Sequence, residues 1–160
     1  MKRLILVYTL TVISLCVVSC SKDSDTAPEE TIIIEENTIV GKWEYFKVAL
    51  QKDDSEFIPY YELFGHEECG KDFSTYKEDN TSQGVFFSKN ENDVCYTEKT
   101  DYEYSLSDGI LTLTLGELTR NQKFEFLSNQ QIKITFLETT IFVTTEYETV
   151  LVSSVILKRV

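Results

Sequence analysis

The chain has 160 residues and carries 27 acidic residues against 15 basic ones, a net charge of -12 at neutral pH. A surface this acidic argues against nucleic acid and anionic lipid headgroups as electrostatic partners, because both repel carboxylates. Ten Phe, nine Tyr and one Trp, with many Thr, Val and Ile, favour β-strands. Only two prolines and six glycines occur, so the composition is neither fibrous nor of low complexity.

The N-terminal segment has the three-part layout of a secretory signal peptide. Lys2 and Arg3 precede an apolar run over residues 4–18. The run is too short for a membrane-spanning helix, which needs about 20 apolar residues. We therefore predict that residues 1–19 are a lipoprotein signal peptide that is removed, which leaves 13 basic residues against 27 acidic ones and a net charge of -14.

The leader ends in Val17-Val18-Ser19-Cys20, which resembles the lipobox of bacterial lipoproteins. The resemblance implies that Cys20 receives acyl chains, palmitate among them, and becomes the first residue of the mature protein. Several chains make anchoring stable, because each buried methylene contributes about 0.8 kcal/mol. We expect an outer membrane lipoprotein of the cell envelope, on the periplasmic or the surface face. An ordinary signal peptide beside an unrelated cysteine is the alternative.

Residues 20–38 open with a polar and acidic stretch that cannot bury a core, and we predict a flexible acidic tether. The opening at residues 20–25, Cys-Ser-Lys-Asp-Ser-Asp, resembles the export tags that carry some gram-negative lipoproteins to the outer face of the outer membrane. A solvated spacer facing the periplasm is the alternative. Residues 39–160 then form one domain of ordinary size.

This domain consists of short alternating segments separated by turn residues, without a persistent helical period. Residues 141–147 are Thr-rich and form either a strand or a strand-like excursion. Residues 51–70 are the one place for a helix or a long loop. The other predicted strands are 42–50, 72–77, 84–88, 100–106, 110–115, 122–127, 131–137 and 149–158.

Turn signals separate several of these strands. Asp108-Gly109 supplies the positive backbone angles that a tight hairpin requires, and Ser128-Asn129-Gln130 marks the next turn. Short links between sequential strands favour antiparallel neighbours, in a closed barrel or in a sandwich. We predict an all-β fold, an antiparallel up-and-down β-barrel of eight or nine strands, because closure removes exposed apolar edges.

An ordered series of motifs runs through the domain: Gly-Lys-Trp at 41–43, Cys-Gly-Lys-Asp-Phe at 69–73, Cys95, Tyr-Glu-Tyr-Ser-Leu at 102–106 and Ile-Leu-Thr-Leu at 110–113. This series resembles the lipocalin-like domain of bacterial lipoproteins and spans nearly all of residues 39–160. The resemblance implies a lipocalin-like barrel in which Trp43 plugs the closed end. Residues 78–84 depart from the pattern, because many relatives have a shorter Gly-rich hairpin there.

Cys69 and Cys95 are the cysteines that remain once the leader is removed and Cys20 is lipidated. An even pair in an exported protein predicts a disulfide. Closing a loop of this length stabilises the fold by about 3 to 4 kcal/mol in the chain-entropy model. Two free buried thiols are the alternative.

No catalytic or cofactor constellation stands out in the sequence. The single histidine, His66, opens a His-Glu-Glu-Cys run whose spacing fits no familiar structural zinc site. No Gly-x-Ser-x-Gly elbow, no Cys-His arrangement and no phosphate-binding glycine loop accompanies it. We expect no enzymatic activity, no metal and no cofactor.

Two functions are compatible with this sequence. In the first, which the lipocalin resemblance implies, the barrel binds a small apolar or amphipathic molecule. In the second, a packed barrel acts as an envelope interaction module that contacts protein or glycan through loops such as the acidic residues 89–93. We expect a monomer whose partners are the membrane, through the acyl chains, and a small hydrophobic ligand. The candidate lining residues, for which core filling is the alternative role, are Tyr102, Tyr104, Phe124 and Phe126.

Overall fold

The computed structural model describes residues 37–144 and 148–160, which belong to one compact unit, Glu35–Val160. The predicted signal peptide, Cys20 and most of the predicted tether lie outside the described residues. The described chain contains nine strands and one short 3-10 helix. They are β1 (Gly41–Leu50), β2 (Asp53–Pro59), η2 (Tyr60–Glu62), β3 (Phe73–Tyr76), β4 (Thr81–Lys89), β5 (Cys95–Ser107), β6 (Ile110–Leu115), β7 (Leu118–Ser128), β8 (Gln131–Val143) and β9 (Thr149–Arg159).

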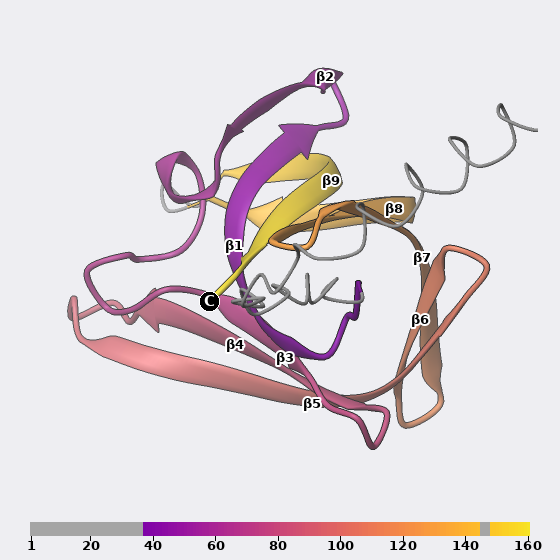
Figure 1. Ribbon diagram of the computed structural model, residues 1–160. Helices are drawn as coiled ribbons and strands as arrows, with labels where there is room; N and C mark the ends of the chain where they lie inside the picture. Colours follow the sequence, from indigo (N-terminus) through magenta and orange to yellow (C-terminus); the bar gives the residue numbers. More distant parts are fainter. Residues whose placement is uncertain (1–36, 145–147) are drawn as a thin grey trace, which may run out of the picture. The chain divides into compact units, whose positions relative to one another are not determined.

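Eight of these strands close into an antiparallel barrel. From β3 to β9 each strand pairs with the next along the chain, and β1 pairs with both β3 and β9 to close the ring. Figure 1 shows β3, β4 and β5 on one side of the ring, β6 and β7 beside them, and β8, β9 and β1 completing it. The predicted all-β up-and-down barrel is confirmed, and closure leaves the ring without a free edge over its paired length.

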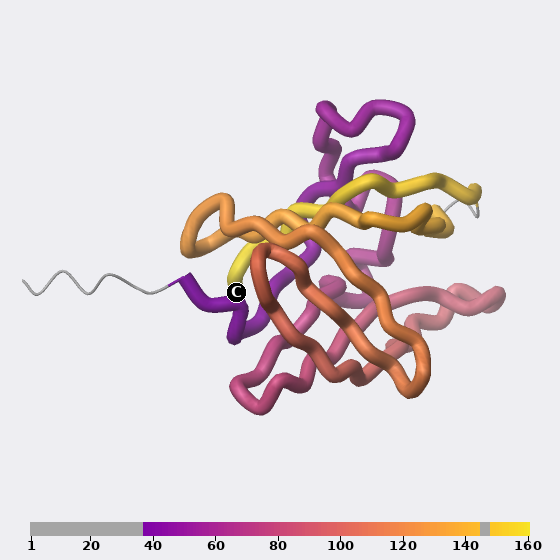
Figure 2. Tube along the Cα trace, turned by 90° about the vertical axis from the view of Figure 1, so that its right-hand side faces the viewer, coloured from indigo at the N-terminus to yellow at the C-terminus, as the bar shows by residue number. Residues whose placement is uncertain are grey.

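The ninth strand, β2, lies outside the ring and pairs with the second half of β1. Residues 41–44 of β1 pair with β3, so the same edge of β1 pairs first with β3 and then with β2. Figure 2 shows the β1–β2 hairpin, in purple, projecting from the barrel. The expectation of a helix or long loop over residues 51–70 was therefore incomplete, because a strand occupies part of this segment. Its sequence, Asp-Asp-Ser-Glu-Phe-Ile-Pro, has none of the apolar alternation that marks the barrel strands.

Four barrel strands are clearly longer than the sequence patterns indicate, among them β4, which spans Thr81–Lys89 rather than residues 84–88. β5 begins at Cys95 rather than at residue 100, β7 begins at Leu118 rather than at residue 122, and β8 continues to Val143. In β5 the added residues are exposed, and they pair in register with β4 from Cys95↔Lys89 onward. Part of the Thr-rich segment 141–147 thus belongs to β8, whereas residues 145–147 lie outside the described residues.

Large side chains fill the end of the barrel where β1 begins and β9 ends, which we call the Trp43 end. Four of them have no exposed surface: Trp43, Leu111, Ile132 and Leu157 are each 0% exposed. They come from β1, β6, β8 and β9 and belong to one apolar cluster. Inward residues of four strands therefore form a continuous core at this end.

Polar contacts around Trp43 attach the preceding segment to the barrel. The Trp43 indole Nε1 donates a hydrogen bond to the Ile39 carbonyl at 2.7 Å. The Arg159 guanidinium lies 4.5 Å above the Trp43 ring and also donates to the carbonyls of Thr38 and Val40. The only Trp of the chain is thus buried between its own strand and the last residues of β9.

At the opposite end, the excursion after β2 packs on the barrel. Tyr60 and Phe64 are each 2% exposed, and their rings lie 5.4 Å apart. Phe64 contacts Phe142 of β8 at 5.3 Å between ring centroids. Aromatic contacts from outside the ring therefore cover the side formed by β1, β8 and β9 at this end.

Candidate ligand cavity

A cavity of about 240 Å³ lies inside the barrel, beside the packed core that contains Trp43. All eight strands of the ring contribute residues to its wall. On four strands, the inward residue two positions away from a packed core residue lines the cavity. These pairs are Trp43 and Tyr45 on β1, Leu111 and Leu113 on β6, Ile132 and Ile134 on β8, and Leu157 and Val155 on β9.

The space arises because small residues occupy inward positions on two neighbouring strands. Ser74 of β3 and Gly84 of β4 lie directly opposite each other in the sheet. Ser82 is the next inward residue of β4, and all three line the cavity. An added Cβ at Gly84 would lie 3.0 Å from the Phe86 ring, so a larger residue would intrude on space now shared with that ring. Where a packed barrel would place large side chains, these strands leave volume.

Five hydroxyl-bearing residues line the side of the cavity formed by β1, β3, β4 and β5, and we call them the hydroxyl wall. Within it, Tyr76 pairs with Ser82 across β3 and β4, and Ser82 pairs with Tyr102 across β4 and β5. The Tyr45 and Ser74 hydroxyl oxygens lie 3.4 Å apart. The five residues are Tyr45, Ser74, Tyr76, Ser82 and Tyr102.

The phenols of Tyr45 and Tyr76 in this wall stay neutral at physiological pH. Burial raises the pKa of Tyr45 to about 12, with the contact to Ser74 lowering it only in part. Burial also raises the pKa of Tyr76, and the nearby Tyr45 and Tyr104 raise it further. The hydroxyl wall therefore offers neutral groups that can each donate or accept a hydrogen bond.

Ser82 has a polar atom without a partner. Its side chain is buried, with 4% of its surface exposed, and its Oγ has no hydrogen-bond partner within the described part of the chain. A buried polar group left unsatisfied costs roughly 1 to 3 kcal/mol, so each such group in a folded protein calls for an explanation. A bound molecule with a polar group would supply the missing partner.

Apolar side chains line the facing side of the cavity. Leu113, Ile134, Phe136 and Val155 come from β6, β8 and β9. They give the cavity an aliphatic and aromatic surface opposite the hydroxyl wall, and Phe86 of β4 adds a ring beside Tyr45 on the wall's own side. The cavity is therefore amphipathic, with apolar groups on one side and neutral hydrogen-bonding groups on the other.

The β6–β7 hairpin contributes the exposed part of the cavity wall. Leu115 and Leu118 flank its turn, line the cavity and are 44% and 68% exposed. Arg120, an exposed residue of β7, also lines the cavity and has no ion pair within the described residues. Among the described lining residues it alone carries a formal charge.

The four candidate lining residues are placed differently by the fold. Tyr102 lines the cavity. Tyr104 does not, and its ring instead packs edge-on against Tyr76 at 5.1 Å. The ring centroids of Phe124 and Phe126 lie 4.8 Å apart. Phe124 belongs to the core cluster and Phe126 packs against it, and neither lines the cavity.

Sequence reasoning missed the residues that create the space and its polarity. Ser74, Ser82 and Gly84 are too small or too polar to stand out in a search for apolar alternation. Arg120 belongs to β7, which begins at Leu118, but it lies before the predicted strand, which begins at residue 122. An available signal was the spacing of two between Ser82 and Gly84, which places both on one face of a strand.

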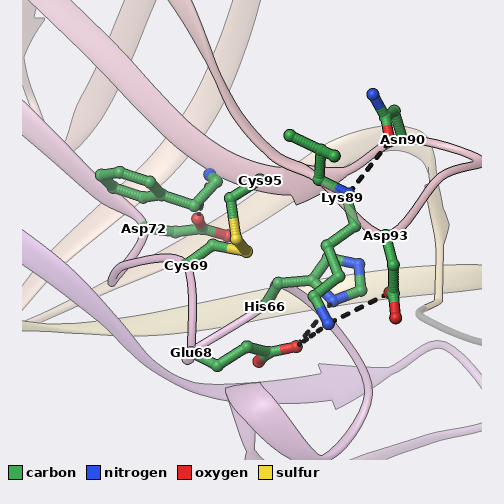
Figure 3. The surroundings of a disulfide bond; sticks show 10 residues. His66, Glu68, Cys69, Asp72, Lys89, Asn90, Asp93 and Cys95 are labelled. Atoms are coloured by element: carbon green, nitrogen blue, oxygen red, sulfur yellow. Dashed lines mark hydrogen bonds and ion pairs between the residues drawn. A yellow bond between two sulfur atoms is a disulfide. The ribbon is translucent and has the colours of Figure 1, made fainter.

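The predicted disulfide is confirmed: Cys69 and Cys95 are bonded, with their Cα atoms 5.5 Å apart. The bond joins the segment before β3 to the first residue of β5, as Figure 3 shows. Beside it, Lys89 lies 3.0 Å from a Glu68 carboxylate oxygen and 3.2 Å from one of Asp93. The acidic segment 89–93, considered above as an interaction loop, is thus attached to the segment that contains Cys69.

Asp72 is a buried hub close to the disulfide. Its carboxylate accepts hydrogen bonds from the Phe87 amide at 2.7 Å and from the Tyr60 hydroxyl at 2.9 Å. Its own amide donates to the Tyr61 hydroxyl at 2.6 Å. Burial raises the pKa of this carboxyl, although the hydrogen bonds partly oppose the shift. Asp72 faces structural partners and does not line the interior cavity.

His66 lies near this hub, with its Nδ1 3.5 Å from a Glu68 carboxylate oxygen. Within residues 37–144 and 148–160, no group of three or more His, Cys, Asp or Glu side chains is arranged to hold a metal ion. The same residues include no helix long and apolar enough to cross a membrane.

Comparisons of the chain with protein-family models, with curated proteins and with solved structures find no match.

Proposed function

We propose that this protein is an exported, membrane-anchored lipoprotein whose lipocalin-like barrel binds a small apolar or amphipathic molecule. The observation that supports binding is the interior cavity of about 240 Å³, to which every strand of the ring contributes. Anchoring is supported by the sequence alone, through the leader at residues 1–19 and the lipobox-like segment that ends at Cys20.

The volume of the cavity limits the size of the ligand. An apolar cavity of roughly 150 Å³ in a protein holds benzene, whereas pockets for drug-sized molecules begin at roughly 300 Å³. The cavity of about 240 Å³ lies between these values. It therefore suits a molecule with one ring and a short substituent, or a short chain of similar volume.

The rim of the cavity supports the entry of such a molecule. Leu115 and Leu118 present apolar surface to solvent on either side of the β6–β7 turn. A ligand that enters there exchanges water for aliphatic contacts before it reaches the interior, which favours apolar and amphipathic molecules. The alternative of a packed interaction module has less support, because the interior contains this space and Asp93 of the acidic segment pairs with Lys89.

The binding proposal is tested by blocking the rim. In Leu115→Trp, the larger ring is expected to obstruct a residue position that lines the cavity and is 44% exposed. The matched control is Leu151→Trp, at a position that is 41% exposed and does not line the cavity. With indole as the probe, NMR titration of the wild-type domain should shift the amides of Ser82 and Ile134. Leu115→Trp should lose these shifts, and Leu151→Trp should keep them.

Native mass spectrometry of the domain purified from its own cells extends this test. A small molecule should travel with the wild-type domain and with Leu151→Trp, and it should be missing from Leu115→Trp. Absence of indole-induced shifts at the cavity amides, together with a ligand-free native mass, would count against a binding role for the interior.

The anchoring proposal has a separate test. Cys20→Ala should abolish metabolic labelling by fatty acid and release the domain from the membrane fraction, because the acyl chains have no other predicted attachment point. Ser21→Ala is the matched control and should leave labelling unchanged. Labelled lipid on Cys20→Ala would contradict the proposal.

A further inference from the structure

The hydroxyl wall holds three hydroxyl groups for which the described chain provides no hydrogen-bond partner. The Ser82 Oγ is buried and unpaired, and neither the Tyr76 nor the Tyr102 hydroxyl has a partner within the described residues. Ser82 pairs in register with both tyrosines, so the three residues lie side by side on β3, β4 and β5. All three line the cavity.

We infer that the ligand of this cavity is a small amphipathic carboxylic acid whose carboxylate accepts hydrogen bonds from the hydroxyl wall at Ser82. This inference rests on the proposed binding function and specifies the chemical class of the ligand. A carboxylate only accepts hydrogen bonds, so it complements neutral hydroxyl donors. Hydrogen bonds from a hydroxyl to a carboxylate are also shorter and stronger than those between neutral groups.

The charge of the lining favours an anion over a cation. The chain carries 27 acidic residues, yet no carboxylate is among the described residues that line the cavity. Arg120 supplies the single positive charge of the lining and has no ion pair within the described chain. Arg120 is exposed but borders the same cavity as the hydroxyl wall, so its charge favours a bound anion over a bound cation. An amine would find no anionic partner there.

The apolar and aromatic lining of the cavity defines the rest of the molecule. Phe86 and Phe136 contribute rings, and the Tyr45 ring lies 5.6 Å from that of Phe86. Aromatic surfaces of this kind pack well against a planar ligand body. The volume leaves room for one ring and a short unsaturated or aliphatic link to the carboxylate.

Isothermal titration calorimetry with a matched series of probes tests this inference. Cinnamate, cinnamamide and cinnamylamine share one body and differ in the polar group, which is anionic, neutral or cationic at neutral pH. Cinnamate should bind at least about tenfold more tightly than the amide, and the amine should bind most weakly.

Variants locate the carboxylate. Ser82→Ala should weaken cinnamate binding by roughly five- to tenfold, with a smaller effect on the amide, because it removes a donor to the charged group. Arg120→Gln should weaken cinnamate severalfold and leave the amide within about twofold. Lys123→Gln, an exposed change on the same strand at a position that does not line the cavity, should alter neither Kd.

The outcomes separate this inference from the function on which it rests. Equal or tighter binding of the amide or the amine would overturn the carboxylic acid assignment while leaving a ligand-binding barrel in place. Tighter binding of cinnamate with an unchanged Kd in folded Ser82→Ala would overturn the placement of the carboxylate. Failure of indole and all three cinnamyl probes to bind would instead contradict the proposed function itself.

Discussion

The Trp43 end and the cavity are built from consecutive inward residues of the same strands, yet one is packed and the other is hollow. On β6, Leu111 is fully buried in the core and Leu113 lines the cavity two residues later. The strands do not change, but the inward residues of their neighbours do: Trp43 contributes bulk to the core, whereas Ser74, its partner across β1 and β3, and Gly84 leave volume. Alternation thus determines which side chains point inward, and their summed volume determines whether they form a core or a site.

The two regions also differ in what stabilises them. The Trp43 end relies on close packing and on Arg159, which connects β9 to the segment before β1. The region around β3, β4 and β5 is held by the Cys69–Cys95 bond and by the hydrogen bonds of the buried Asp72. Space inside a barrel removes dispersion contacts, and here covalent and polar contacts reinforce the neighbouring strands.

The largest expected difference between the two regions comes from a matched pair on one strand. Leu111→Ala should lower the free energy of unfolding by about 3 to 4 kcal/mol, because it leaves a void in a packed core. Leu113→Ala should cost only about 1 to 2 kcal/mol, because this half-buried side chain already borders empty volume. Urea denaturation measures both values. Equal costs would show that the cavity is filled or collapsed in solution.

Removal of the disulfide should come next in size. Cys69→Ala combined with Cys95→Ala is expected to lower the free energy of unfolding by about 3 kcal/mol, since the bond closes a loop with a sequence separation of 26. Hydrogen exchange should show faster exchange in the first residues of β5 and little change around Trp43. Wild-type protein under reducing conditions is the control and should behave alike. Uniform loss of protection at both ends would contradict the division into two regions.

A smaller effect of opposite sign is expected at Ser82. Ser82→Ala should leave the stability unchanged or raise it by up to about 1 kcal/mol, because its buried hydroxyl has no partner in the described chain. Ser74→Ala is the matched control and should be neutral or slightly destabilising, because it loses the contact with the Tyr45 hydroxyl. Thermal unfolding without ligand distinguishes the two. A marked loss of stability in Ser82→Ala would mean that its hydroxyl is satisfied in solution.

The smallest expected effect is a pH dependence due to Asp72. Because burial raises its pKa in the folded state, the folded protein holds this proton more tightly than the unfolded chain does. The contribution of Asp72 to stability is therefore greatest below its ordinary pKa, near 3.9, and decreases as the pH rises through the raised value. Asp72→Asn keeps an acceptor for the Phe87 amide and cannot ionise.

The stability of the wild type relative to Asp72→Asn should accordingly decline as the pH rises above about 3.9. Other carboxyl groups titrate in both proteins, so the difference isolates Asp72. Urea denaturation at several pH values measures it. A difference that is constant or that grows with pH would contradict the raised pKa.

Local features of the fold could be predicted because their causes lie within a few residues. Asp108-Gly109 forms the expected hairpin turn, with φ values of 51° and 73°, since few other dipeptides adopt two positive angles at low cost. Strands with apolar alternation, such as β6 and the first part of β8, were found at nearly their observed positions. The pairing of Cys69 with Cys95 followed because the domain offers no other combination.

Other features depend on neighbours that are distant in the chain. β2 has no apolar alternation and forms through the edge that the second half of β1 leaves beside β3. The exposed start of β5 is a strand because β4 extends alongside it. Tyr102 and Tyr104 share one face of one strand, yet only Tyr102 reaches the cavity. No property of that strand alone distinguishes the two residues.

By itself, the sequence determined the all-β class, the order and direction of the barrel strands, the hairpin turn and the cysteine pair, because period-two patterns and turn residues act locally. Only the tertiary structure decided where the interior is hollow. That volume is the sum of side chains from eight strands meeting across the barrel, and it depends on Ser74 and Gly84 facing one another in a register set by the whole ring.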